Sequence, residues 1–172
     1  VIDLGNTIAL DLSSPEVIWE NITSKNRNII RKAQKNNIQI HHTEDYSIFE
    51  HFISIYNQTM QRDNAEEYYY FQEEFYKAIH DYLKGNYQVF YATLDDQIIA
   101  VSIILYANKQ IHYHLSGSLS EYRSFAPTNL LLYEVALWGH QEGYKTFHLG
   151  GGLGSGNDNL YKFKAAFNRK SG

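Results

Sequence analysis

The feature that most constrains the fold is a succession of two strands, a loop, a buried helix and a third strand. Residues 98–106 form a nearly continuous apolar run, which is typical of a strand covered on both faces. In residues 111–115, apolar side chains alternate with His112 and His114, so the two histidines share one face of the next strand. These two segments predict the centre of a sheet.

The loop and the helix follow these strands. Small and polar residues over 116–128 lead to a mostly apolar helix over 129–143. A strand over 145–149 then runs into a turn rich in glycine, Gly150 to Gly156. The loop ends at a helix N-terminus, where unpaired backbone N–H groups and the helix dipole favour an anion. It is therefore either an anion-binding segment or a plain connection.

Apolar periodicity and turn residues predict the remaining elements. The expected strands cover residues 7–12, 38–41, 87–94 and 97–106, and the expected helices cover residues 15–35, 46–60, 71–83 and a last segment that ends near 168. Asp45 is the expected cap of the second helix, Gly85 is the expected stop of the third, and Asp95-Asp96 forms a hairpin turn. This order is neither a regular strand–helix alternation nor a series of short strands. We therefore expect an α/β (mixed α+β) fold, with a mixed sheet and helices on both sides.

Composition narrows the function. A chain of 172 residues with 44% hydrophobic residues is long enough to bury a core of its own. The formal net charge of −4 gives no global basic field, so we expect no DNA partner and only a small contact with any nucleic acid. The chain has no cysteine, which excludes a disulfide, a thiolate nucleophile and a cysteine-based zinc site. No apolar run approaches the roughly 20 residues of a membrane span, and we favour the cytoplasm.

The predicted first helix is strongly basic. Its cations lie between apolar positions, and they are Lys25, Arg27, Arg31, Lys32 and Lys35. Such a run forms either a solvated helix face or a patch that faces an anion. The chain begins at Val1 without a methionine, and we interpret it as a piece of a longer protein.

Several chemistries lack support in the sequence. The glycine-rich turn lacks the lysine and hydroxyl of a P-loop, and no register gives G-x-G-x-x-G, so its glycines rather allow a sharp turn or the close approach of a ligand. His112 and His114 have no third ligand nearby, and we expect no metal site. No G-x-S-x-G motif supports a hydrolase triad. Tyr68 to Tyr70 either rim a pocket or serve ordinary packing.

Four motifs together resemble a known family. They are Trp19 followed by KNRNIIRKAQK over 25–35, YNQTMQR over 56–62, HLGG over 148–151, and LYKFKAAF over 160–167. In this order they resemble the FemABX-type peptidoglycan-bridge aminoacyltransferases, a branch of the GNAT acyltransferase superfamily. Members of that branch carry W … R-x-x-I-R-K-A-x-K, then D-L-G-G, then F-K-x-x-F. His148 stands where those relatives usually have aspartate.

The resemblance implies a GNAT-like central mixed sheet flanked by helices. Its sheet would splay between the strands 110–117 and 145–149 to admit an acyl donor. Residues 37–172 would form the GNAT-like domain, incomplete at its C-terminus because the last two strands are missing. Residues 1–36 would be a strand and a basic helix that link it to a missing upstream half.

The resemblance also implies an activity. The enzyme would move an acyl or aminoacyl group from acyl-CoA or the end of an aminoacyl-tRNA to an amine, such as a small molecule or a peptidoglycan precursor, without a tightly bound cofactor. Two alternatives stay open. One is an acyl-CoA-dependent N-acetyltransferase of polysaccharide or small-molecule metabolism, and the other is a noncatalytic GNAT-like domain that binds a cell-wall ligand or completes a partner.

The resemblance and the position of the residues suggest roles at the site. The expected catalytic residues are Lys164, His114 and Glu121. The expected donor-binding residues are Ser116, Gly117, Ser118, Thr128, Asn129 and Phe163, and the expected substrate-binding residues are Arg31, Arg62 and Tyr113. Lys164 would be an exposed cation beside the donor's phosphate or the oxyanion, with little effect on stability.

The strand 145–149 lacks the neighbours that a complete GNAT-like sheet would give it. An open edge of this kind is a template for pairing with another chain. We expect the edge to be paired in a dimer, closed by another part of the same chain, or left as a lattice contact. We also expect residues 1–172 alone to be weakly active or inactive.

Overall fold

A computed structural model describes residues 7–62, 72–150 and 159–170. Within these residues, one six-stranded sheet has the strand order β1-β6-β5-β4-β3-β2. Its strands are β1 (Ile8–Asp11), β2 (Gln39–Thr43), β3 (Tyr87–Leu94), β4 (Gln97–Ala107), β5 (Gln110–Ser118) and β6 (Thr146–Gly150). Neighbouring strands are antiparallel except for β5 and β6, which are parallel. The predicted mixed sheet is confirmed.

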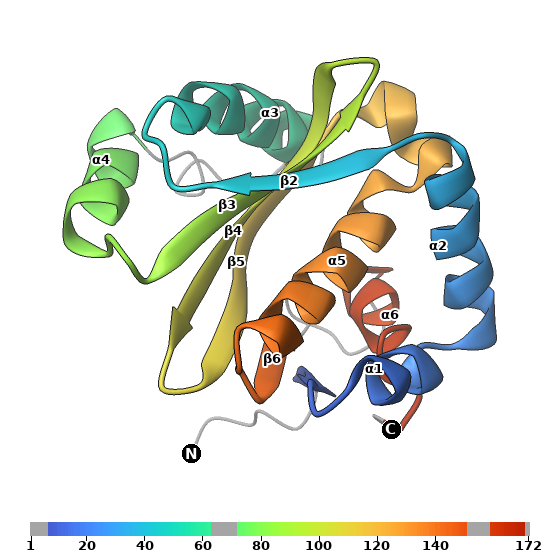
Figure 1. Cartoon of the computed structure of the whole chain (residues 1–172). Helices are drawn as coiled ribbons and strands as arrows, with labels where there is room; N and C mark the ends of the chain where they lie inside the picture. Colours follow the sequence, from blue (N-terminus) through green and yellow to red (C-terminus); the bar gives the residue numbers. More distant parts are fainter. Residues whose placement is uncertain (1–6, 63–71, 151–158, 171–172) are drawn as a thin grey trace.

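Helices cover both faces of this sheet, as predicted (Figure 1). They are α1 (Pro15–Asn21), α2 (Ser24–Lys35), α3 (Ile48–Arg62), α4 (Glu73–Tyr82), α5 (Pro127–Gln141) and α6 (Asn159–Ala165), with a 3₁₀ turn over Ser120–Phe125. The two faces differ in their helices: α3 and α4 lie on one side, and α5 lies on the other with α1, α2 and α6 around it (Figure 1).

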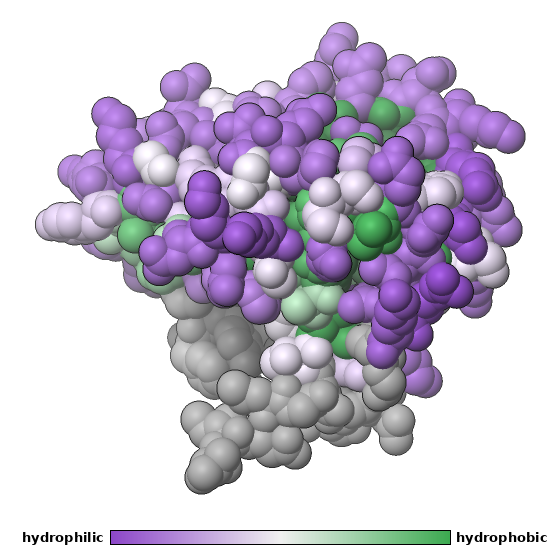
Figure 2. Space-filling view, turned by 60° about the horizontal axis from the view of Figure 1, so that its bottom comes forward, coloured by the Kyte–Doolittle hydropathy of each residue, from purple (hydrophilic) through white to green (hydrophobic). Residues whose placement is uncertain are grey.

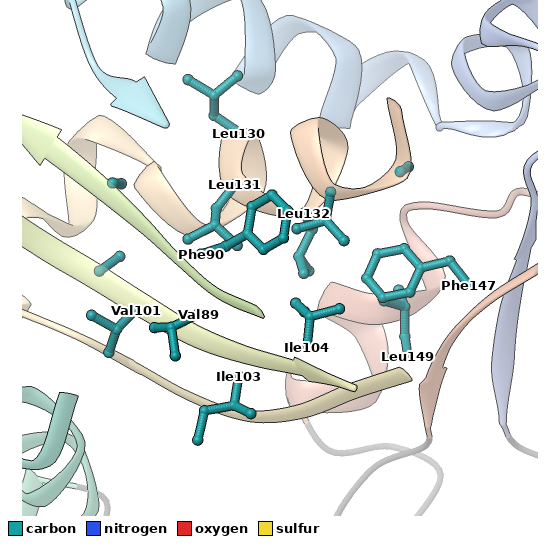
Figure 3. Close-up of a cluster of buried hydrophobic side chains, with 14 of the residues drawn as sticks. Val89, Phe90, Val101, Ile103, Ile104, Leu130, Leu131, Leu132, Phe147 and Leu149 are labelled. Carbon is teal, nitrogen blue, oxygen red and sulfur yellow. The ribbon is translucent and has the colours of Figure 1, made fainter. Parts of the chain in front are cut away.

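The central strand β4 explains why residues 98–106 read as continuously apolar. Val101 and Ile103 point away from α5, whereas Ile104 points toward it (Figure 3). All three side chains are 0% exposed. Because both faces of the strand are covered by helices, every position favours an apolar side chain except Ser102. The predicted position of this strand in the middle of the sheet is confirmed.

Tight turns fix the order of the strands. Asp95 and Asp96 both have positive φ, 51° and 67°, as the predicted hairpin between β3 and β4 requires. Asn108 and Lys109 make the same kind of turn between β4 and β5, with φ of 55° and 68°. Gly85 follows α4 with φ of 85°, in agreement with the predicted helix stop.

The predicted helix over 15–35 is two helices. α1 ends at Asn21, and Ile22 has extended backbone angles and no exposed surface. Thr23 then starts α2, because its side-chain oxygen accepts a hydrogen bond from the backbone N–H of Asn26 at 3.3 Å. The predicted continuous helix is wrong at this point, since a cap signal interrupts it.

Two further boundaries differ from the prediction. α3 begins at Ile48, whose N–H donates to the carbonyl of Asp45 at 3.2 Å, so Asp45 contributes to a turn before the helix. The predicted loop 116–128 begins with the end of β5, continues as the 3₁₀ turn, and gives way to α5 already at Pro127. A proline suits this first helical position, because the N–H that it lacks has no partner there in any helix.

The outer edge of β6 is closed by the N-terminal part of the chain. β1 pairs with β6 in antiparallel register, with Ala9 opposite His148 and Asp11 opposite Thr146. Of the three outcomes expected for this edge, the structure shows closure by another part of the same chain.

The surface is largely hydrophilic on the face shown in Figure 2, with smaller apolar areas at its centre, near its top and on its left side. Among the described residues, Tyr82 and Leu83 are the large hydrophobic side chains with high exposure. No helix in this part of the chain combines the length and the apolar character needed to cross a bilayer.

Candidate active site

The parallel strands β5 and β6 separate after three paired positions. Gln110 lies opposite Thr146, Ile111 opposite Phe147, and His112 opposite His148. Beyond His112, β5 continues to Ser118 paired with β4 alone. The divergence predicted for these two strands is therefore confirmed, and it leaves a gap in the sheet that no backbone ladder closes among the described residues.

The side chain of Lys164 lies at this branch point. Its Nζ atom is 5.5 Å from the centroid of the Tyr113 ring on β5. On the other strand, a Cβ built on Gly150 would lie 3.7 Å from the same Nζ. Tyr113 directly follows the last paired residue of β5, and Gly150 ends β6. α6 thus places an ammonium group between the two strands where they part.

Lys164 is buried rather than exposed. Its side chain keeps 8% of its surface accessible to solvent, which corrects the expectation of an exposed cation. Phe167, three residues after Lys164 and just beyond the end of α6, is fully buried as well. A charge held in such a place interacts more strongly with a developing negative charge than one in water does.

The hydroxyl groups of Tyr113, Ser102 and Ser116 form a polar cluster. The Ser102 hydroxyl, 0% exposed, donates to Ser116 Oγ at 3.2 Å. The Tyr113 hydroxyl is hydrogen-bonded to both serines. Burial raises the pKa of Tyr113, and the two serine hydrogen bonds oppose this effect only in part. The phenol therefore stays protonated at neutral pH and can act as a hydrogen-bond donor.

The start of α5 carries no side-chain cap. Its cap residue is Ala126, in the left-handed conformation with φ of 53°, and it offers no side-chain oxygen to the first turn. The N–H groups of Thr128 and Asn129 therefore lie at a helix end that favours an anion. This end is linked to α6 through Asn26, which contacts both the Asn129 side chain and the carbonyl of Ala166.

The sequence profile of the family described as "Acetyltransferase (GNAT) domain" matches residues 24–164. This chain belongs to the acetyltransferase (GNAT) domain family. No curated protein matches the chain. The matched range covers the branch point, the start of α5 and Lys164.

Solved structures share the fold of this GNAT domain. FemX superposes with a TM-score of 0.81 at 14% identity, over 94% of this chain and 57% of the FemX chain. A protein from Agrobacterium fabrum, described as the C-terminal domain of a lysylphosphatidylglycerol synthetase, gives 0.68 at 14% identity, over 94% and 55%. An aminoglycoside acetyltransferase from an uncultured soil sample gives 0.53 at 9% identity, over 67% and 80%. The chain spans little more than half the length of the first two. These likenesses show a shared fold.

Two predicted donor-binding residues of the GNAT domain are engaged with α3. A Cβ on Gly117 would lie 2.9 Å from the Cα of Tyr56, so this glycine permits the close approach of helix and strand. The N–H of Ser118 donates to Thr59 Oγ1 at 2.9 Å, and its carbonyl accepts from Arg62 at 3.0 Å. Their role in donor binding stays a prediction.

The other predicted catalytic side chains are on β5 and in the 3₁₀ turn. His114, on β5, keeps a large exposed fraction, yet the surrounding protein lowers the pKa of its ring by desolvation. Glu121 is exposed in the 3₁₀ turn, where it accepts a hydrogen bond from Ser120 at 3.4 Å. Phe163 is half-buried beside Lys164 and meets Phe167 edge-on at 5.7 Å.

The structure does not bring Arg31 and Arg62 together. Arg31 is exposed on α2, with its guanidinium 5.1 Å from the centroid of the Trp19 ring. Arg62 ends α3, on the other side of the sheet (Figure 1). Their roles in substrate binding stay predictions.

Two features of the site escaped the sequence analysis. His112 and His148 stack with ring centroids 4.8 Å apart at the last paired position before the gap. Asn26 is 1% exposed and joins three helices. The spacing of Asn26 in the sequence could have indicated its burial. It shares one buried face of α2 with Ile30 and Ala33, so a polar residue lies in an apolar stripe.

Two predicted features remain outside the described residues, the glycines 151–156 and the tyrosines 68–70. Among the residues that are described, no group of three His, Asp or Glu side chains could hold a metal ion. The division into residues 1–36 and 37–172 stays a prediction.

Proposed function

We propose that this GNAT domain transfers an acyl group from an ester or thioester donor to a substrate amine. The observation that carries the proposal is the Lys164 ammonium between the diverging ends of β5 and β6. We assign the point where the two strands part as the place where the donor would bind. The buried cation marks the place where negative charge would be stabilised.

The reaction needs three things from the site. The amine attacks the carbonyl carbon, the carbonyl oxygen becomes an oxyanion, and the attacking nitrogen loses a proton while the donor's oxygen or sulfur leaves and takes up a proton. Lys164 would stabilise the oxyanion or a donor phosphate, and its low exposure strengthens that interaction. The face of the Tyr113 ring would help to hold this ammonium at the branch point.

The start of α5 would hold the phosphates of the donor. Its first-turn N–H groups at Thr128 and Asn129 are not capped by a side chain of the cap residue. Acyl-CoA and aminoacyl-tRNA both carry phosphates. This feature therefore suits both donor classes.

Direct transfer fits the residues of the chain. The chain has no cysteine that could serve as a nucleophile. Direct attack by the amine needs no covalent enzyme intermediate. His114 would accept the proton from the attacking amine, because its lowered pKa keeps the ring neutral at pH 7. Glu121 is the alternative acceptor.

The finer proposal concerns the two substrates. The FemABX-type motifs favour an aminoacyl-tRNA as donor and a peptidoglycan precursor as acceptor, in the cytoplasm. The shared fold with FemX supports this branch. The fold shared with aminoglycoside acetyltransferases supports the second candidate, transfer of an acetyl group from CoA to an amine of a small molecule or polysaccharide.

A donor screen tests the proposal. The protein would be incubated with labelled acetyl-CoA, longer acyl-CoA thioesters or a pool of charged tRNAs, each with a nucleotide-linked muropeptide or an aminoglycoside as acceptor. Mass spectrometry would detect the acylated amine, and Lys164→Met would serve as the matched variant. Product from one donor class with wild type, and loss of that product with Lys164→Met, supports the proposal. Binding of donors without any transfer would favour the noncatalytic alternative.

A further inference from the structure

The amide of Asn26 joins two walls of the candidate site. Its Oδ1 accepts a hydrogen bond from Asn129 Nδ2 at 2.9 Å, and its own Nδ2 donates to the carbonyl of Ala166 at 3.3 Å. The partners lie 103 and 140 residues away in the sequence. With 1% exposure, the amide has little access to water that could replace either bond.

The two partners belong to the elements that carry the proposed chemistry. Asn129 lies in the first turn of α5, where the donor phosphates are expected. Ala166 directly follows α6, two residues beyond Lys164. Asn26 therefore spans the distance between the donor end of α5 and the helix that presents the ammonium.

α6 depends on such contacts for its position. It has seven residues, and a helix of this length is not stable by itself in water. The N–H of Thr23 also donates to the Ala166 carbonyl, at 3.0 Å, and the N–H of Arg169 donates to the Asn21 carbonyl at 2.7 Å. Those two bonds hold the end of α6 against the junction of α1 and α2. Among these bonds, the Asn26 side chain is the one that reaches on to α5.

We propose that Asn26 is a positioning residue for acyl transfer. It fixes Lys164 relative to the start of α5, so that the cation and the bound donor meet in one geometry. The role of Lys164 in this inference rests on the proposed function, whereas the positioning of its side chain does not. Small misplacements of catalytic groups have large kinetic effects, because a shift of about 1 Å can lower a rate by about a hundredfold.

Asn26→Asp acts on one of the two bonds. The carboxylate still accepts from Asn129, but it has no N–H for the Ala166 carbonyl and sets a negative oxygen against it, so the link to α6 is replaced by a repulsion. Asn129→Leu does the reverse and leaves the link to α6 in place. The matched control is Asn28→Asp on the same helix, because Asn28 is exposed and its Oδ1 merely accepts from Arg31 at 2.9 Å.

The experiment has two readouts on the full chain. The first is steady-state transfer with whichever of acetyl-CoA and charged tRNA supports it. The second needs no donor: a pulse of acetic anhydride acylates free amines, and mass spectrometry compares Lys164 with the exposed Lys162 as internal reference. Thermal unfolding of each variant shows that it is folded at the assay temperature.

We expect Asn26→Asp to lower kcat at least about tenfold with little change in the donor KM, and to raise the acylation of Lys164 relative to Lys162 severalfold. Asn28→Asp should match wild type in both readouts. A folded Asn26→Asp variant with wild-type kcat and wild-type Lys164 acylation would overturn the inference. If Asn26→Asp does not fold, Asn129→Leu decides: a lowered kcat beyond any change in the donor KM supports the inference, and a raised donor KM alone or wild-type kinetics overturns it. If wild type transfers no acyl group, the proposed function fails, and the acylation ratio of Asn26→Asp against Asn28→Asp still decides whether Asn26 positions Lys164.

Discussion

The Nζ atom of Lys164 lies 5.5 Å from the centroid of the Tyr113 ring, at the position where β5 and β6 part. The face of an aromatic ring attracts a cation, so Tyr113 helps to hold the ammonium in a place with little water. Hydrogen bonds of the Tyr113 hydroxyl to Ser102 and Ser116 fix the same ring. One helix and two neighbouring strands thus hold the Lys164 ammonium at a defined position.

Replacing Lys164 should affect transfer more than folding. Lys164→Met keeps most of the apolar side chain and removes the charge, so packing around α6 is retained. We expect kcat/KM to fall about a hundredfold, as for the loss of one preorganised donor to an oxyanion. The midpoint of thermal unfolding should change little. Equal transfer by wild type and variant would remove Lys164 from the mechanism.

Gly150→Ala should lower both the stability of the domain and the transfer rate. Gly150→Ala places a methyl group 3.7 Å from Lys164 Nζ at a residue with φ of +77°. Gly143→Ala is the matched control, because Gly143 has φ of +87° and no atom within 4 Å of its added Cβ. Both variants should lose about 1 kcal/mol of unfolding free energy from backbone strain, measured by urea denaturation. Only Gly150→Ala should also lower the transfer rate, and a loss of transfer in Gly143→Ala alone would contradict this assignment.

The sequence predicted the centre of the fold well, since its signals are local. The apolar run 98–106 and the turn at Asp95-Asp96 each depend on residues that are adjacent in the chain. The helix break at Ile22 was missed because a buried isoleucine continues the apolar stripe, while the cap at Thr23 that interrupts it resembles an ordinary polar position.

The candidate site was less predictable, because long-range contacts create it. Lys164 was singled out by resemblance, yet its burial depends on the packing of α6 against segments more than a hundred residues earlier. Asn26 and Asn129 appear as unrelated polar residues until the fold places their amides 2.9 Å apart. Gly117 could be a flexible loop residue or a packing residue in the sequence, and only the approach of Tyr56 shows the packing.

Gly117→Ala should destabilise the domain through α3. The added Cβ would lie 2.9 Å from the Cα of Tyr56 and 3.0 Å from Thr59 Oγ1, so strand and helix must move apart. We expect a loss of about 1–3 kcal/mol in the free energy of unfolding, the usual range for overpacking a core. Ser120→Ala, at an exposed position three residues later, adds no volume and is the control for chemical denaturation. An unchanged denaturation midpoint for Gly117→Ala would show that α3 can shift freely.

Stability should fall on mild acidification because of the histidines at the branch. The pKa of His148 is lowered, first by burial and then by the neighbouring His112, and the pKa of His114 is lowered by burial. The folded protein therefore takes up these protons at a lower pH than the unfolded chain, whose histidines titrate near 6.5. The contribution of these histidines to the free energy of unfolding is fully present above pH 6.5. It is lost as the pH falls from about 6.5 toward the lowered pKa values of the folded protein.

His148→Gln removes one titrating group while keeping a polar side chain of similar length. Urea denaturation at a series of pH values between 7.5 and 5 should give a smaller loss of unfolding free energy for His148→Gln than for wild type, and identical pH dependence would show that His148 does not contribute.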